Sequence, residues 1–142
     1  MIANEIISKA EYADIIITLM KPPYEISSIT KLILIAFCVK NESHQSAYRN
    51  RTKDFVDVFF SNISLRLSAH YQEIGQIIQV IDMLNKTSKV QIDGDYIVLT
   101  HDFSYKTENA FLKYCATKTL NPIIEINKLD EKALVEEVLR YV

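Results

Sequence analysis

The side chains of this sequence that could support catalysis or hold a metal ion are few and scattered. The three histidines, His44, His70 and His101, lie in separate segments. His101 precedes Asp102, and such a pair could ligate a metal or act as a general base oriented by a carboxylate. Zinc sites and metalloproteases need further ligands at short fixed spacings, such as HExxH or CxxC, and the sequence contains neither. We therefore expect no metal site and no catalytic residue.

Glycine is also scarce, and its scarcity excludes further classes of enzyme. Phosphate-binding loops and dinucleotide-binding folds need several glycines at fixed offsets, because their backbones turn tightly and approach the ligand closely. The two glycines of the chain, Gly75 and Gly94, lie far apart. The sequence therefore predicts a protein that is not an enzyme and that uses no cofactor and no small-molecule substrate.

The cysteines and the hydropathy of the chain indicate its compartment. Cys38 and Cys115 both lie in apolar stretches, which favours reduced, buried thiols of an intracellular protein. The N-terminus lacks the positively charged and apolar regions of a signal peptide. The longest apolar run, residues 32–39, is much shorter than the roughly 20 residues that span a bilayer. We expect a soluble, cytoplasmic protein without membrane contact.

Basic side chains gather in a single segment that follows a predicted helix. They could bind the phosphates of a nucleic acid or an acidic protein partner. They could equally form a solvated loop in which they pair with neighbouring acids, since exposed ion pairs are common and weak. The net charge of −2 provides no general attraction to nucleic acid, so we expect DNA contact only within a complex. The basic residues are Lys40, Arg49, Arg51 and Lys53.

The elements that must position these side chains are mainly helices. Residues 4–20 carry apolar side chains at helical spacing, among them Ile6 and Ile7, but the β-branched run 15–18 leaves a strand open. Two prolines end this element. A second helix is predicted to begin after a serine cap and to run to about Asn41. It is apolar around most of its circumference, which is typical of a central helix.

The clearest helix of the sequence lies directly before a predicted hairpin. An apolar stripe and a polar face alternate along it with the period of an amphipathic helix. In the hairpin, Asp93-Gly94 supplies the turn, because glycine adopts a positive φ without a Cβ clash. The apolar stripe consists of Ile74, Ile77, Ile78, Ile81 and Leu84, and the polar face consists of Gln72, Glu73, Gln76, Gln79, Asp82 and Lys86.

This order of helices followed by a hairpin is that of a winged helix. In DNA-binding winged helices, the helix before the wing enters the major groove and offers Arg, Lys, Asn or Gln to the base edges. Here that helix carries two acids against one lysine, and the wing carries Asp93 and Asp95. Such charges repel phosphate. The pattern therefore favours a structural winged helix over a DNA reader.

The C-terminal part, residues 105–142, is predicted to be helical, with Asp130 capping the last helix. One side of that helix is apolar, and it could pack on the protein's own core or dock onto a helix or coiled coil of another chain. The candidate partner-binding residues are Leu134, Val135, Val138, Leu139 and Tyr141.

Together these elements predict one mainly α domain over residues 1–142, with a small β-hairpin. Its core is expected to be winged-helix-like and to cover about residues 24–100. An N-terminal helix and the C-terminal helical extension flank this core.

Three segments, residues 28–37, 73–84 and 90–99, together resemble the middle component of three-component ABC-ATPase defence systems of bacteria, the Lamassu type. The resemblance is one of pattern and order and covers the predicted winged-helix core. It implies a non-enzymatic accessory subunit that works with an SMC-like or Rad50-like ATPase and an effector, often a nuclease, in a complex that senses foreign DNA. It assigns no site residues, because the matching positions are structural.

Two functions stay open at this point. The first is an adaptor subunit that bridges such an ATPase and its effector in defence against phages or plasmids. The second is a winged-helix DNA-binding transcriptional regulator, dimeric through its terminal helices, whose Arg49, Arg51 and Lys53 contact phosphates.

Overall fold

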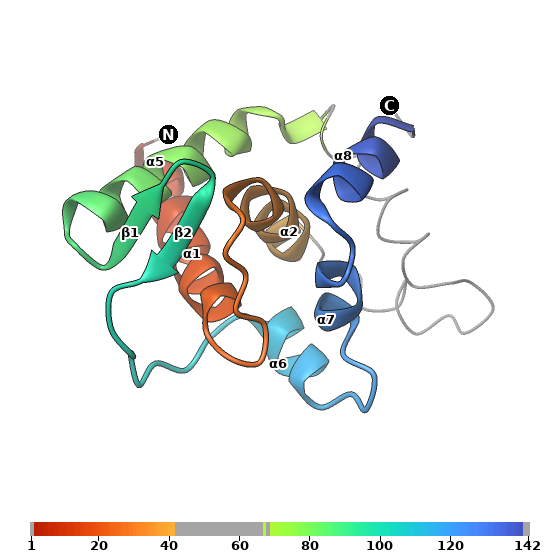
Figure 1. Cartoon of the computed structure of the whole chain (residues 1–142). Helices are drawn as coiled ribbons and strands as arrows, with labels where there is room; N and C mark the ends of the chain where they lie inside the picture. Colours follow the sequence, from red (N-terminus) through yellow and green to blue (C-terminus); the bar gives the residue numbers. More distant parts are fainter. Residues whose placement is uncertain (1, 42–66, 68, 141–142) are drawn as a thin grey trace.

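The computed structural model describes residues 2–41, 67 and 69–140 of the chain. Three helices, α1, α2 and α5, contact one another in pairs, and a two-stranded hairpin packs against α1 and α5 (Figure 1). This is the mainly α fold with a small hairpin that the sequence predicts. The elements are α1 (Ile2–Met20), α2 (Ile29–Asn41), α5 (Gln72–Lys86), β1 (Val90–Asp93), β2 (Tyr96–Leu99), α6 (Ala110–Ala116), α7 (Pro122–Asn127) and α8 (Glu131–Arg140).

The first segment forms a helix, α1, rather than a strand, and it lies in the centre of the fold. The prediction that Ile6 and Ile7 lie on its buried apolar face is wrong, because these side chains are 63% and 57% exposed. Burial against α2 and α5 outweighs the small helix-propensity cost of its β-branched residues. Neither α1 nor any other helix in the described ranges is long and apolar enough to cross a membrane. The fully buried face consists of Tyr12, Ile15, Ile16 and Leu19.

Helix α2 begins where the serine cap predicts. The hydroxyl oxygen of Ser28 accepts a hydrogen bond from the backbone N–H of Lys31 at 3.3 Å. The helix is then buried on most sides, as its continuous apolar sequence predicts. Its buried residues are Leu32, Ile35, Ala36, Phe37, Cys38 and Val39.

The hairpin follows α5 directly and forms an antiparallel pair in which Asp93 lies opposite Tyr96. Its turn therefore consists of Gly94 and Asp95, one residue later than the predicted Asp93-Gly94, and Gly94 takes a φ of +61° at the first turn position. Type II′ hairpin turns place glycine at this position, because only glycine adopts such a φ without strain. One face of the hairpin packs on the helices, and Val90 and Ile97 on this face are almost completely buried.

The outer edge of β2 is covered by the segment that precedes α2. Ser28 and Tyr96 form an antiparallel bridge. The backbone N–H of Ile97 donates to Ser27 O at 2.9 Å, and that of Ile29 donates to Asp95 O at 3.0 Å. These bonds join the hairpin to the start of α2.

The three C-terminal helices begin at side-chain caps. Asn109 Oδ1 accepts from the backbone N–H of Leu112 at 2.9 Å, and Asp130 Oδ1 accepts from that of Ala133 at 2.7 Å, which confirms the predicted cap of α8. Asn121 caps α7 in the same way. The buried side chains of α6, α7 and α8 belong to the same hydrophobic cluster as those of α1, α2 and α5.

The two glycines provide a matched test of this backbone. Gly94→Ala is expected to lower the free energy of unfolding by about 1 kcal/mol, because alanine is strained at a positive φ. Gly75→Ala is expected to raise it by roughly 0.5–1 kcal/mol, since Gly75 lies inside α5 and an added Cβ meets nothing within 4 Å. Urea unfolding followed by helical circular dichroism measures both changes. Equal stabilities of the two variants would contradict the turn geometry.

Candidate functional site

The structure describes one member of the predicted basic cluster. Arg49, Arg51 and Lys53 lie outside the described residues, and their predicted contacts with phosphate or an acidic partner stay predictions. Lys40 lies in the last turn of α2, where its side chain is only 16% exposed. Its Nζ lies 3.2 Å from Glu73 Oε1 and 3.9 Å from Glu11 Oε2. The charge of Lys40 is therefore balanced within the molecule.

Lys40 belongs to a polar cluster at the junction of α1, α2 and α5, formed by Tyr12, Lys40 and Glu73. The Tyr12 hydroxyl donates to Glu73 Oε1 at 2.6 Å, and Lys40 Nζ lies 5.2 Å from the centre of the Tyr12 ring. Asn41 Nδ2 donates to the Tyr12 oxygen at 3.4 Å. Each polar group of this Tyr12–Lys40–Glu73 cluster thus has a partner, as groups removed from water require.

Part of the predicted polar face of α5 is not exposed to solvent. Glu73 was expected in solvent, but its side chain is 14% exposed. Gln76, on the same side of the helix, accepts a hydrogen bond from the Ser8 hydroxyl. Helix α1 covers this side of α5. The sequence of α5 does not reveal this burial, because polar residues that face a polar partner show the same pattern as polar residues that face water.

The electrostatics of the cluster are those of a structural ion pair. Burial alone raises the pKa of Glu73, but hydrogen bonds from Tyr12, Lys40 and Asn41, together with the charge of Lys40, outweigh burial and hold this pKa below its usual value. Burial, and then the hydrogen bond to Glu73, raise the pKa of Tyr12 far above its usual value. Glu73 is therefore ionised and Tyr12 neutral at pH 7.

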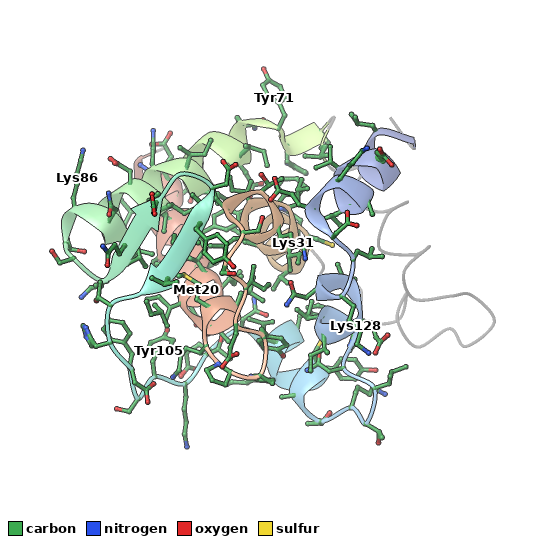
Figure 2. All side chains as sticks on the ribbon, viewed as in Figure 1. Met20, Lys31, Tyr71, Lys86, Tyr105 and Lys128 are labelled. Atoms are coloured by element: carbon green, nitrogen blue, oxygen red, sulfur yellow. The ribbon has the colours of Figure 1, made fainter. Side chains whose placement is uncertain are left out.

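The outer surface of α5 and the hairpin is mixed in character and carries no excess of positive charge. Asp82, Asp93 and Asp95 are exposed, against the exposed Lys86 and Lys89. Asp82 and Lys86 also pair with each other at 2.9 Å. Tyr71 and Lys86 mark the two ends of this surface and point away from the ribbon (Figure 2). Large apolar side chains are exposed beside these charges, namely Tyr71, Ile78, Met83, Tyr96 and Val98.

The predicted partner-binding face of α8 divides into buried and exposed parts. Leu134 is completely buried and belongs to the core, which its helical spacing alone did not reveal. Leu139 is 65% exposed, and Val135 is half-buried. The side chain of Val138 and the whole of Tyr141 lie outside the described residues. We therefore retain Val135 and Leu139 as candidate contact residues.

Val135 and Leu139 form one side of an apolar groove whose other side is α2. The groove has a volume of about 240 Å³. Its remaining lining residues are Thr30, Ile33 and Leu34 of α2. From the sequence, these α2 residues were predicted only to belong to a central helix. Helix α2 is apolar on all sides, so the side that stays open depends on which elements pack against it. We name this feature the α2–α8 groove.

The histidines and cysteines form no reactive site in the part of the chain that the structure describes. His101 packs on Phe103, with ring centroids 3.8 Å apart, and no group of three metal-ligating side chains occurs among these residues. Cys38 and Cys115 are both buried, as predicted. Burial raises the pKa of the Cys115 thiol to about 12, so this thiol stays protonated and unreactive at neutral pH.

Removing Glu73 tests the structural role of the Tyr12–Lys40–Glu73 cluster. Glu73→Ala is expected to lower the free energy of unfolding by about 3 kcal/mol, because it leaves Lys40 and Tyr12 without their main acceptor in a largely buried place. The matched control is Asp82→Ala on the same helix, which removes an exposed and screened pair and is expected to change stability little. Similar losses in the two variants, measured by urea unfolding, would show that the cluster is not stabilising.

The lowered pKa of Glu73 also predicts how stability depends on pH. Its stabilisation is complete above the pKa of about 4.3 that glutamate has in an unfolded chain, and it is lost as the pH falls through the lower pKa of the folded protein. The stability advantage of the wild type over Glu73→Gln should therefore be largest at neutral pH and shrink below about pH 4. Urea unfolding of both proteins over this range measures it. An advantage that stays constant into acid would contradict the assignment.

No protein-family model, no curated protein and no solved structure matches this chain.

Proposed function

We propose that the protein is a cytoplasmic, non-catalytic adaptor subunit with a winged-helix core. In this proposal it bridges an SMC-like, Rad50-like ATPase and an effector such as a nuclease in an anti-phage or anti-plasmid defence complex. The observation that carries the proposal is the solvent-open, apolar α2–α8 groove, with Leu139 65% exposed on its rim. Exposed apolar side chains that converge on a groove are typical of a surface that binds another protein.

The order and pairing of the elements support the winged-helix part of the proposal. Helices α1, α2 and α5 precede the hairpin, and an isolated β-bridge between Ser28 and Tyr96 joins the segment before α2 to it. The amphipathic helix that comes directly before the wing is α5. Helix α2, helix α5 and the hairpin follow one another in the order expected from the sequence.

The charges of α5 and the hairpin support a protein partner over duplex DNA. Affinity for a duplex rests mainly on lysines and arginines that neutralise phosphates. The exposed carboxylates of Asp82, Asp93 and Asp95 oppose such contact, and Lys40 is already paired with Glu73. Exposed tyrosine and aliphatic side chains on the same surface are instead suited to protein contact.

The α2–α8 groove also indicates the form of the partner segment. Val135 and Leu139 are one helical turn apart and face Ile33 and Leu34 across the groove. An amphipathic helix with apolar side chains at a spacing of three to four residues fits such a groove.

Co-purification of the tagged chain from cells that express its neighbouring genes tests the adaptor function. At about 0.3 M salt, which suppresses association through phosphates, a large ATPase and an effector should be recovered. Leu139→Asp should reduce their recovery about tenfold or more, because it places a charge in the apolar groove. The matched control Leu120→Asp, at a side chain that is 71% exposed between α6 and α7, should keep full recovery.

Two outcomes would contradict the adaptor function. One is equal recovery of both partners by Leu139→Asp and Leu120→Asp, with both variants folded. The other is recovery of the chain alone at this salt and with DNA at lower salt, which would favour the transcriptional regulator. In that case, replacing Arg49, Arg51 and Lys53 by glutamate should abolish DNA binding and flatten its salt dependence.

A further inference from the structure

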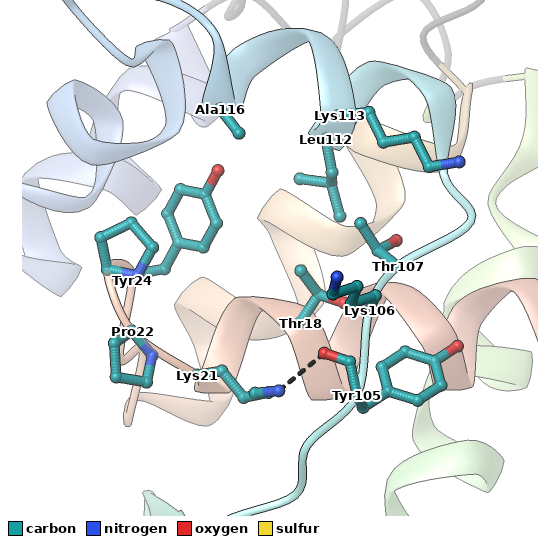
Figure 3. A pocket seen from close by; sticks show the side chains of 11 residues that line it. Thr18, Lys21, Pro22, Tyr24, Tyr105, Lys106, Thr107, Leu112, Lys113 and Ala116 are labelled. Carbon is teal, nitrogen blue, oxygen red and sulfur yellow. Dashed lines mark hydrogen bonds between the residues drawn. The ribbon is translucent and has the colours of Figure 1, made fainter.

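A second hollow of the surface lies at the C-terminal end of α1 and shares no lining residue with the α2–α8 groove. It has a volume of about 410 Å³, which is within the range of small-molecule pockets. The last turn of α1, the turn that follows it, residues 105–107 and helix α6 contribute its walls (Figure 3). These segments are distant in the sequence, so only the folded chain brings them together.

The walls of this pocket are largely apolar and are held in place. Pro22, Tyr24, Leu112 and Ala116 line it, and Tyr24 and Leu112 are themselves almost completely buried. The Tyr24 hydroxyl oxygen accepts from Asn121 Nδ2 at 3.0 Å, which fixes the ring. A flat aromatic or branched apolar group can therefore pack against a preformed surface, with little cost of ordering the protein.

Three lysines provide positive charge at the same pocket, namely Lys21, Lys106 and Lys113. Lys21 Nζ donates to the backbone oxygen of Tyr105 at 2.7 Å, which uses one of its three donors and places the ammonium beside the pocket (Figure 3). Lys113 pairs with the exposed Glu108 at 3.5 Å. Within the described part of the chain, neither Lys21 nor Lys106 forms an ion pair.

The carboxylates of neighbouring residues are engaged elsewhere. Asp14 lies one turn before Thr18 on α1, and its Oδ2 accepts the backbone N–H of Glu108 at 3.1 Å. The Thr18 hydroxyl donates to Asp14 O at 2.8 Å. The three lysines still outnumber the two carboxylates beside the pocket, Asp14 and Glu108, so the net formal charge around it is positive and attracts anions.

We propose that this pocket binds a small organic anion. The apolar body of the ligand, aromatic or branched, packs against Pro22, Tyr24 and Leu112. Its carboxylate or phosphate lies between Lys21 and Lys106, which bind either group as point charges. The inference goes beyond the adaptor function and does not depend on it, and it assigns the protein a small-molecule ligand that the sequence did not predict.

Titrations of the full-length protein, followed by its amide NMR signals, test this site with three probes. Phenyl phosphate combines both features, whereas inorganic phosphate lacks the apolar body and benzyl alcohol lacks the charge. Phenyl phosphate should bind about tenfold more tightly than either, and its shifts should map to residues 18–24, 105–107 and 112–116.

Variants separate a built site from general attraction between charges. Lys21→Gln combined with Lys106→Gln should weaken phenyl phosphate binding about tenfold, because charge-assisted contacts are lost. Ala116→Phe should block the pocket while keeping both lysines. Lys132→Gln removes an exposed charge from α8, away from the pocket, and should leave binding unchanged.

Three results would overturn the proposal. The first is the absence of saturable shifts with about 10 mM phenyl phosphate, a concentration that would reveal even weak binding. The second is shifts that map away from the pocket. The third is equal affinity of the wild type, the double lysine variant and Ala116→Phe, with all three proteins folded.

Discussion

The fold depends on how α1, α2 and α5 share one apolar junction that also holds an ion pair. Ionised side chains that leave water are tolerated only when partners replace their hydration. Glu73 meets this condition through Tyr12 and Lys40, which come from the other two helices. Sliding α1 along α5 by one turn would leave Tyr12 and Glu73 without each other. The cluster therefore disfavours other registers of α1 against α5.

Ser28 positions the hairpin and α8 relative to helix α2 of this junction. Its hydroxyl oxygen accepts from Lys31 at the start of α2, and its backbone forms the bridge with Tyr96 of the hairpin. The same hydroxyl donates to Glu131 Oε2 at 2.7 Å, at the start of α8. One residue thus connects the hairpin, α2 and α8. Because Leu134 is buried just beyond this contact, α8 is held beside α2 with Val135 and Leu139 over the groove.

The two hollows of the surface differ in the chemistry that they offer. The α2–α8 groove is lined by aliphatic side chains and one threonine, so it offers shape and apolar surface and little charge. The pocket at the end of α1 adds unpaired ammonium groups to an apolar wall. A helix of a partner suits the first and a compact anion suits the second. Helix α2 lines the groove and the end of α1 lines the pocket, so the junction between these helices positions both sites.

The sequence by itself determined the elements whose signals are local. A serine cap marked the start of α2 and Asp130 marked that of α8. The spacing of apolar residues marked α5, and Gly94 marked the hairpin turn. Tertiary structure alone decided which faces are covered. It placed Glu73 inside, left Ile6 and Ile7 in solvent, and divided α8 between the core and a groove. It also brought Lys21 beside Tyr105, although 84 positions separate them. The physical reason is that caps, turns and periodicity act within a few residues, whereas burial and pairing depend on which distant surface each helix meets.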